Sequence, residues 1–80
     1  MVFFVLSTKG FETVKHFSRQ CPVWLNCDGL SDSEIEGLRA NGHLLTNFVK
    51  GIDPADQIAI STAIETIKQH HNDDVVWLEQ

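Results

Sequence analysis

The chain has 80 residues, with six lysine and arginine residues, eleven aspartate and glutamate residues, and a formal net charge of −5 at pH 7. This length predicts one folded domain, residues 1–80, with no room for a second core. The net negative charge and the scattered basic residues argue against nucleic-acid and anionic-membrane partners. A hydrophobic fraction of 42% with 21% charged residues is typical of a globular domain and argues against disorder.

Four apolar runs predict strands: Val2–Leu6, Val23–Cys27, His43–Val49 and Val75–Leu78. The first run is continuous, which is typical of a strand covered on both faces. It is too short to cross a membrane and has no basic flank, so we expect no membrane attachment and a cytoplasmic location. The five phenylalanines are expected in the core: Phe3, Phe4, Phe11, Phe17 and Phe48.

Two short helices are predicted between the strands. Apolar residues at intervals of three predict the first helix, over residues 9–19. Two hydroxyl residues precede it as candidate N-caps, Ser7 and Thr8. Ser31 and Glu34 have the spacing of a capping box and predict a second helix over residues 32–41. Gly42 then suits the left-handed position that ends a helix.

The longest amphipathic segment, Asp53–His71, predicts a third helix. Asp53 suits its N-cap, and Pro54 suits the first helical position, where a missing N–H costs nothing. Four apolar residues follow at helical spacing and form one stripe: Ile60, Ala63, Ile64 and Ile67. Such a helix needs a sheet to pack on, because an isolated amphipathic helix is unstable.

The order β-α-β-α-β-α-β predicts a small three-layer α/β domain with a four-stranded, mostly parallel sheet. When the strands are ranked by apolarity, the first and then the third take the central positions. The expected strand order is therefore 2-1-3-4, a flavodoxin-like or Rossmann-like arrangement. A thioredoxin-like or ferredoxin-like sheet with one antiparallel strand is the alternative.

In an open parallel sheet, ligands bind beyond the carboxyl ends of the strands, where the strand order reverses. For the order 2-1-3-4 this rule selects the loops after the first and third strands, with the loop after the second strand beside them. The candidate ligand-binding residues on these loops are Ser7, Thr8, Lys9, Asn26, Cys27, Asp28 and Lys50. The segment after the first strand offers hydroxyls, an amine and backbone amides to a phosphate. It lacks a glycine-rich phosphate motif, so helix capping is the favoured interpretation.

No catalytic or metal constellation emerges from the sequence. Asp28 beside Cys27 raises a thiol pKa, and a thiol nucleophile needs the opposite environment. Cys21 and Cys27 are expected to be free thiols, since their C-x₅-C spacing matches no zinc or redox pattern. The cluster His70–Asp74 likewise matches no known ligand spacing. We therefore expect no catalytic residue, no metal and no cofactor.

The tryptophans point to a protein partner. Trp24 and Trp77 fall on the strands that this order places at the two edges, and aromatic edge strands favour pairing between chains. A homodimer through such an edge, or binding of another protein, is the expected interaction, and packing of each tryptophan under a helix is the alternative that stays open. The sequence thus favours a small non-catalytic interaction or regulatory domain. Two alternatives stay open: a module that binds a phosphate-bearing anionic ligand, and a thiol-dependent enzyme that uses Cys27.

Overall fold

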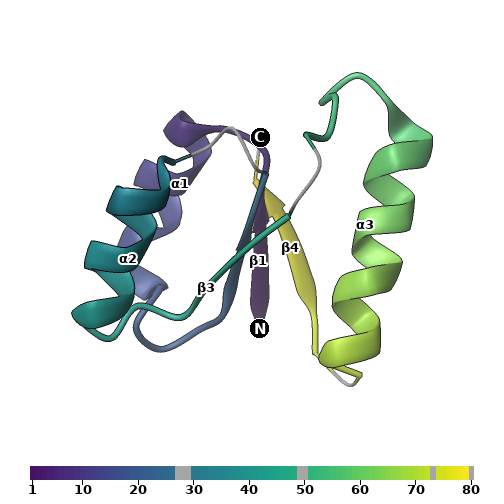
Figure 1. The fold of residues 1–80 in the computed structure, drawn as a ribbon. Helices are drawn as coiled ribbons and strands as arrows, with labels where there is room; N and C mark the ends of the chain where they lie inside the picture. The colour runs from purple at the N-terminus through teal and green to yellow at the C-terminus, as the bar shows by residue number, and fades with distance from the viewer. Residues whose placement is uncertain (27–29, 49–50, 73, 80) are drawn as a thin grey trace.

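The computed structural model describes residues 1–26, 30–48, 51–72 and 74–79. Strands and helices alternate along the chain as predicted, and Figure 1 labels them. In chain order they are β1 (Val2–Val5), α1 (Thr8–Val14), the 3₁₀ helix η1 (Lys15–Phe17), β2 (Val23–Leu25), α2 (Asp32–Ala40), β3 (Leu45–Asn47), α3 (Gln57–His70) and β4 (Val76–Glu79). β2 and β3 are shorter than the predicted runs, and β4 is shifted by one residue.

All four strands are parallel, in the order β3-β2-β1-β4. β1 lies between β2 and β4, which confirms the predicted central position of the first apolar run. The thioredoxin-like and ferredoxin-like alternatives are wrong, because every strand pair in the described sheet is parallel. The predicted order 2-1-3-4 is also wrong, because β3 pairs with β2 and not with β1.

The order prediction failed because most of the third apolar run lies outside the strand. Only Leu45–Asn47 pairs with β2, and Leu45 is its one buried residue. Leu44 is exposed before the strand begins. Phe48 lies beyond the end of the strand, where its ring packs against the rings of Phe4 and Trp24 at centroid distances of 5.5 and 5.3 Å. The run is therefore apolar because of packing outside the β-ladder, and β3 itself is a short edge strand.

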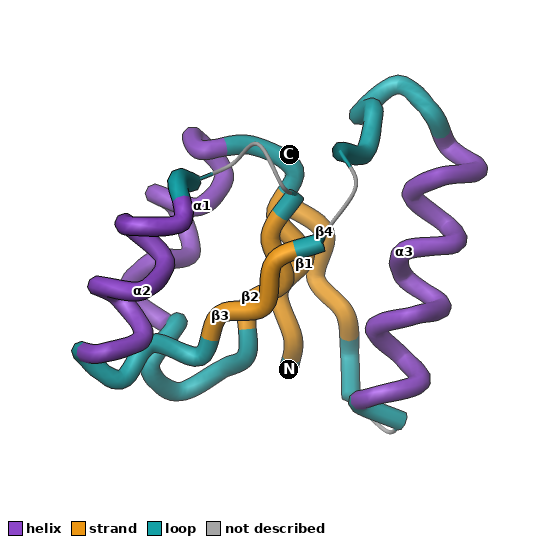
Figure 2. Tube along the Cα trace, in the orientation of Figure 1, coloured by secondary structure: helices purple, strands orange, loops and turns teal. Residues whose placement is uncertain are grey.

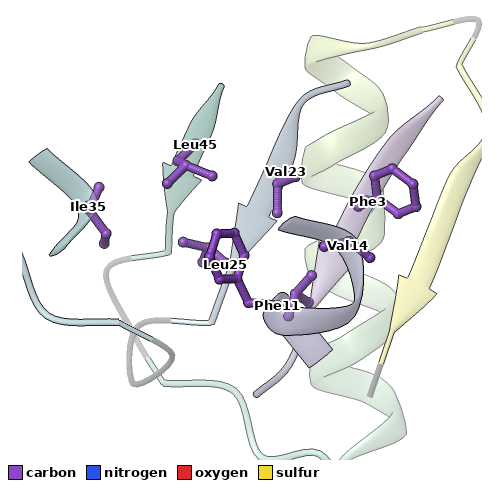
Figure 3. Packing of buried hydrophobic residues seen from close by; sticks show 8 residues of the cluster. Phe3, Phe11, Val14, Val23, Leu25, Ile35 and Leu45 are labelled. Carbon is purple, nitrogen blue, oxygen red and sulfur yellow. The ribbon is translucent and has the colours of Figure 1, made fainter. Parts of the chain in front are cut away.

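Helices cover both faces of the sheet and give three layers (Figures 1 and 2). α1 and α2 lie on one face, and α3 lies on the other. Alternate side chains of β1 serve the two faces: Phe3 and Val5 point towards α1 and α2, while Val2 and Phe4 point towards α3. Figure 3 shows the first of these two clusters, built from strand residues and the inner faces of α1 and α2.

The predicted capping residues of the two shorter helices are present in the structure. Ser7 caps α1, with its Oγ accepting from the Gly10 amide at 3.0 Å. Ser31 and Glu34 form the predicted capping box at the start of α2, with reciprocal bonds of 3.2 and 3.3 Å. Gly42 follows α2 with φ of 90°, the left-handed conformation that glycine adopts without steric cost.

α1 is shorter than the predicted helix over residues 9–19. It ends at Val14, and the chain tightens into η1. Phe17, at the end of η1, is 50% exposed, so its predicted place in the core is wrong. One face of its ring stacks on Phe3 at a centroid distance of 5.9 Å. Phe17 thus contacts Phe3 on one side and solvent on the other.

α3 begins three residues later than predicted. Its N-cap is Asp56, whose Oδ1 accepts from the amides of Ile58 and Ala59, both at 3.1 Å. Asp53 instead accepts from the Ala55 amide at 2.9 Å and closes a turn ahead of the helix. Both aspartates are good capping residues, and the one that satisfies two helical amides starts the helix.

Candidate functional site

The observed strand order moves the expected position of a ligand site. In the order 3-2-1-4 the chain reverses direction between β1 and β4, so the loop after β3 no longer borders the reversal point. Four of the seven candidate residues lie in the described part of the chain: Ser7, Thr8, Lys9 and Asn26. The other three, Cys27, Asp28 and Lys50, lie outside the described residues.

Asn26 directly follows β2, and its side chain bonds to the segments that follow β1 and β3. The residue is buried, with 4% of its surface exposed. Its Nδ2 donates to the carbonyls of Leu6 and Ile52 at 3.2 and 2.8 Å, and its Oδ1 accepts from the Ile52 amide at 2.9 Å. These bonds use the polar groups of the amide to hold the chain together, which is a structural role.

The remaining described candidates serve the start of α1. Ser7 uses its hydroxyl as the N-cap, Thr8 is the first helical residue, and Lys9 is exposed beside it. The Asn47 side chain also bonds to the backbone at this end of the sheet. With its amide nitrogen turned towards β2, it donates to the carbonyls of Leu25 and Asn26 at 3.3 and 3.2 Å. At this end of the sheet, the side chains of Ser7, Asn26 and Asn47 therefore bond to the backbone.

The double histidine at the end of α3 packs against Trp24. The Trp24 Nε1–H donates to His71 Nε2 at 3.3 Å, and the ring of His70 lies 5.4 Å from the Trp24 ring between centroids. In the parts of the chain that the structure describes, no group of three or more His, Cys, Asp or Glu side chains is arranged to hold a metal ion. Cys21, the described cysteine, is a free thiol as predicted.

Trp24 is not an edge residue. Its strand, β2, lies between β1 and β3, and the side chain is only 7% exposed. The prediction that Trp24 presents an edge surface is therefore wrong, and it follows from the incorrect strand order. Trp77 does lie on an edge strand, β4, and is 51% exposed. Its Nε1–H donates to Glu79 Oε2 at 3.1 Å, which holds the ring along the strand.

β4 presents an open backbone edge. The amides of Val2 and Leu6 donate to the carbonyls of Val75 and Glu79 at 2.8 and 3.0 Å, so alternate residues from 75 to 79 bond to β1. The backbone groups of the residues between them, Val76 and Leu78, therefore point away from the sheet. Within the described ranges no strand pairs with this outer side of β4.

The opposite edge of the sheet is partly covered. Val23 N donates to Leu44 O at 2.8 Å, which directs the next carbonyl, that of Leu45, to the outer side of β3. Arg39 of α2 binds that carbonyl through Nε and Nη2, at 3.0 and 2.8 Å. The two edges thus differ: an arginine occupies one outward carbonyl of β3, while β4 carries a half-exposed tryptophan. The edge of β4 is the candidate functional site.

Sequence reasoning identified Trp77 but missed the contrast between the two edges. Arg39 gave no local signal, because its role depends on which strand lies at the margin.

No described helix is both long enough and apolar enough to cross a bilayer. Comparison of the chain with protein-family models, with curated proteins and with solved structures found no match.

Proposed function

We propose that the protein is a non-catalytic interaction domain that binds through the outer edge of β4, and that its partner is a second copy of the same chain. One observation carries this proposal: β4 combines outward backbone groups with the half-exposed Trp77, whereas Arg39 occupies an outward carbonyl of the other edge. Open edge strands are templates for strand pairing, and proteins that do not use them usually protect them.

The strand order supports addition of a strand at this position. The order 3-2-1-4 corresponds to the first four strands of the Rossmann order 3-2-1-4-5-6, in which a fifth strand lies outside the fourth. A second chain that pairs with β4 takes the place of that fifth strand. Main-chain hydrogen bonds then supply affinity, as in other cases of strand addition.

The outward groups of β4 specify a register for pairing. A two-fold axis between identical strands requires antiparallel pairing, and both partners must present outward residues to each other. Val76 of one copy then pairs with Leu78 of the other, and the reverse pair forms by symmetry. Trp77 lies on the axis opposite its own counterpart. This register uses every outward backbone group between Val76 and Leu78.

The same register gives compatible side chains on the face that carries Trp77. The two Trp77 rings are neighbours, and aromatic pairs across antiparallel strands are favourable. Val75 of one copy lies opposite Glu79 of the other, so the two Glu79 carboxylates are not placed opposite each other. Val75 is 65% exposed in the single chain, and pairing covers it.

Analytical ultracentrifugation of the wild-type chain and of Trp77→Lys tests this function. The wild type is expected to form dimers whose fraction rises with protein concentration, and a lysine on the edge is expected to leave only monomers. Ile58→Lys is the matched control, because Ile58 is an exposed apolar residue on α3, away from β4. Circular dichroism checks that both variants fold. A wild type that stays monomeric at every concentration contradicts the proposal, as does equal loss of dimers in both variants.

A further inference from the structure

A second surface gathers positive charge at the amino end of the sheet, away from the edge of β4. It is a depression of about 380 Å³ lined by Glu12, Lys15, His16, Arg19 and His43. This volume lies at the lower end of the range of about 300–1,000 Å³ that is typical of small-molecule sites. Two of the six lysine and arginine residues and two of the four histidines line it, in a chain of net charge −5. Glu12 is its one carboxylate.

His43 is held in place by a buried serine. Ser18 is fully buried, and its Oγ–H donates to the Lys15 carbonyl at 2.8 Å. The Ser18 Oγ also contacts His43 Nδ1. The single Ser18 hydroxyl proton is donated to the Lys15 carbonyl. His43 Nδ1 must therefore be the donor in its contact with the Ser18 Oγ. His43 Nε2 remains as the ring nitrogen without a partner among the described residues, on a side chain that lines the depression.

The cations that surround His43 are available to a ligand. Arg19 is anchored by its Nε, which donates to the Asn41 carbonyl at 3.1 Å. Within the described residues, neither the Lys15 ammonium nor the His16 ring has a hydrogen-bond or ion-pair partner. Burial lowers the pKa of His43, and the positive charges of Arg19 and Lys15 lower it further. The local potential at the imidazole is therefore positive.

The adjacent helix end does not cancel this potential in full. Carbonyls at the end of a helix carry partial negative charge, which disfavours anions. Here the Lys15 carbonyl accepts from the amide and the hydroxyl of Ser18, at 3.3 and 2.8 Å. The Phe17 carbonyl accepts from the amides of Gln20 and Cys21, at 3.0 and 2.8 Å. These donors offset the exposed carbonyl charge next to the cations.

We propose that this depression is a binding site for a doubly charged oxyanion, namely phosphate or a phosphate monoester of a small molecule. Arg19 and Lys15 supply the charge, because guanidinium and ammonium groups are the usual partners of phosphate oxygens. His43 donates from Nε2 once the anion favours its protonated form, and the Ser18 contact persists because it uses Nδ1. A phosphate ion does not fill about 380 Å³, which leaves room for the group that a monoester carries.

Amide and histidine NMR spectra recorded at low ionic strength test the site. Inorganic phosphate and glycerol phosphate are each titrated into the wild-type chain, and chloride at matched ionic strength is the reference. Saturable shifts confined to residues 12–20 and 41–44 are expected. Tighter binding of glycerol phosphate assigns a monoester, and equal binding assigns the free ion. Sulfate, which keeps both charges as the pH changes, is expected to raise the pKa of His43.

Charge variants separate this site from general attraction. Arg19→Gln and Lys15→Gln are each expected to weaken phosphate binding about three- to fivefold, as for an exposed charge pair. Lys68→Gln is the matched control, since Lys68 is an exposed cation on α3. Shifts that chloride reproduces, or equal weakening by Lys68→Gln, overturn the proposal. Because all three side chains are exposed, the variants are expected to fold.

Discussion

Arg39 donates from Nε and Nη2 to the carbonyl of Leu45, at 3.0 and 2.8 Å, and so covers part of the outer edge of β3. This contact links α2 to the strand that follows it and occupies a carbonyl that would otherwise face solvent. The described part of β4 has no counterpart to it. The two margins of the sheet therefore differ chemically, which is the basis for assigning the interaction to β4.

Replacing Arg39 opens the edge of β3. Arg39→Met keeps the aliphatic stem and removes both hydrogen bonds to Leu45. We expect a loss of about 1 kcal/mol in the free energy of unfolding, because the contact is charge-assisted but partly exposed. Association beyond the dimer is also expected, as a second edge becomes free. Urea denaturation and light scattering measure the two effects.

Lys68→Met is the control for Arg39→Met, since it removes an exposed cation that lies on α3. This variant is expected to have the same urea midpoint of unfolding as the wild type and to show no new association. Equal scattering from the two variants would mean that loss of charge, rather than the freed edge, drives the association.

Asn26→Ala is expected to be the most destabilising of these substitutions. It leaves the buried Leu6 carbonyl, and the partly buried amide and carbonyl of Ile52, without their present partner. The expected loss is about 2–4 kcal/mol in the free energy of unfolding, measured by urea denaturation. Asn41→Ala provides the comparison, because the exposed Asn41 side chain makes one bond, to Gly37 O at 3.0 Å. Similar losses in both variants would contradict the role assigned to Asn26.

Stability is expected to depend on pH through His43. Its pKa in the folded chain is lowered from the ordinary value of 6.5, by burial first and then by Arg19 and Lys15. The unfolded chain therefore binds the proton more readily. The contribution of neutral His43 is complete above pH 6.5 and is lost as the pH falls towards the folded-state pKa.

Urea midpoints measured from about pH 8 to about pH 5, the range in which histidine titrates, check this dependence. His43→Gln is expected to flatten the decrease below pH 6.5. His16→Gln changes an exposed histidine of the same depression and is expected to retain the decrease. A wild-type slope that persists unchanged in His43→Gln would show that other groups cause it.

Local sequence signals predicted local structure well. The capping box at Ser31 and Glu34, the N-cap at Ser7 and the left-handed Gly42 are all as predicted, because each depends on neighbours within a few residues. The start of α3 was less predictable. Asp53 and Asp56 are both suitable caps, and only the folded chain shows that Asp56 satisfies two helical amides.

Strand order was beyond these signals because it depends on distant contacts. Phe48 made the third run look central, yet it packs on Phe4 and Trp24 from beyond the strand. The candidate ligand residues followed from that order, and two of the described ones, Ser7 and Asn26, bond to the backbone. Asn26 still carried a usable signal, since a polar residue that ends an apolar strand needs buried partners. The role of Arg39 had no such signal.

Disulfide trapping tests the paired edge most directly. In the proposed register Val75 lies opposite Glu79 of the second copy as a non-hydrogen-bonded pair, with Cα atoms about 4.5 Å apart, which a disulfide spans. Identical positions lie about 13 Å apart, four strand residues, and cannot be bridged. The design is the double variant Val75→Cys and Glu79→Cys, each single variant, and a background in which Cys21 and Cys27 are serine.

After oxidation, non-reducing electrophoresis is expected to show covalent dimers for the double variant and monomers for both single variants. Trp77 is retained in all three proteins, so the Trp77 pair of the proposed contact can still form, although Glu79→Cys removes the bond from the Trp77 indole to Glu79. Covalent dimers from either single variant would indicate a different register. Monomers from all three would contradict pairing through β4 and, with it, the function proposed for this protein.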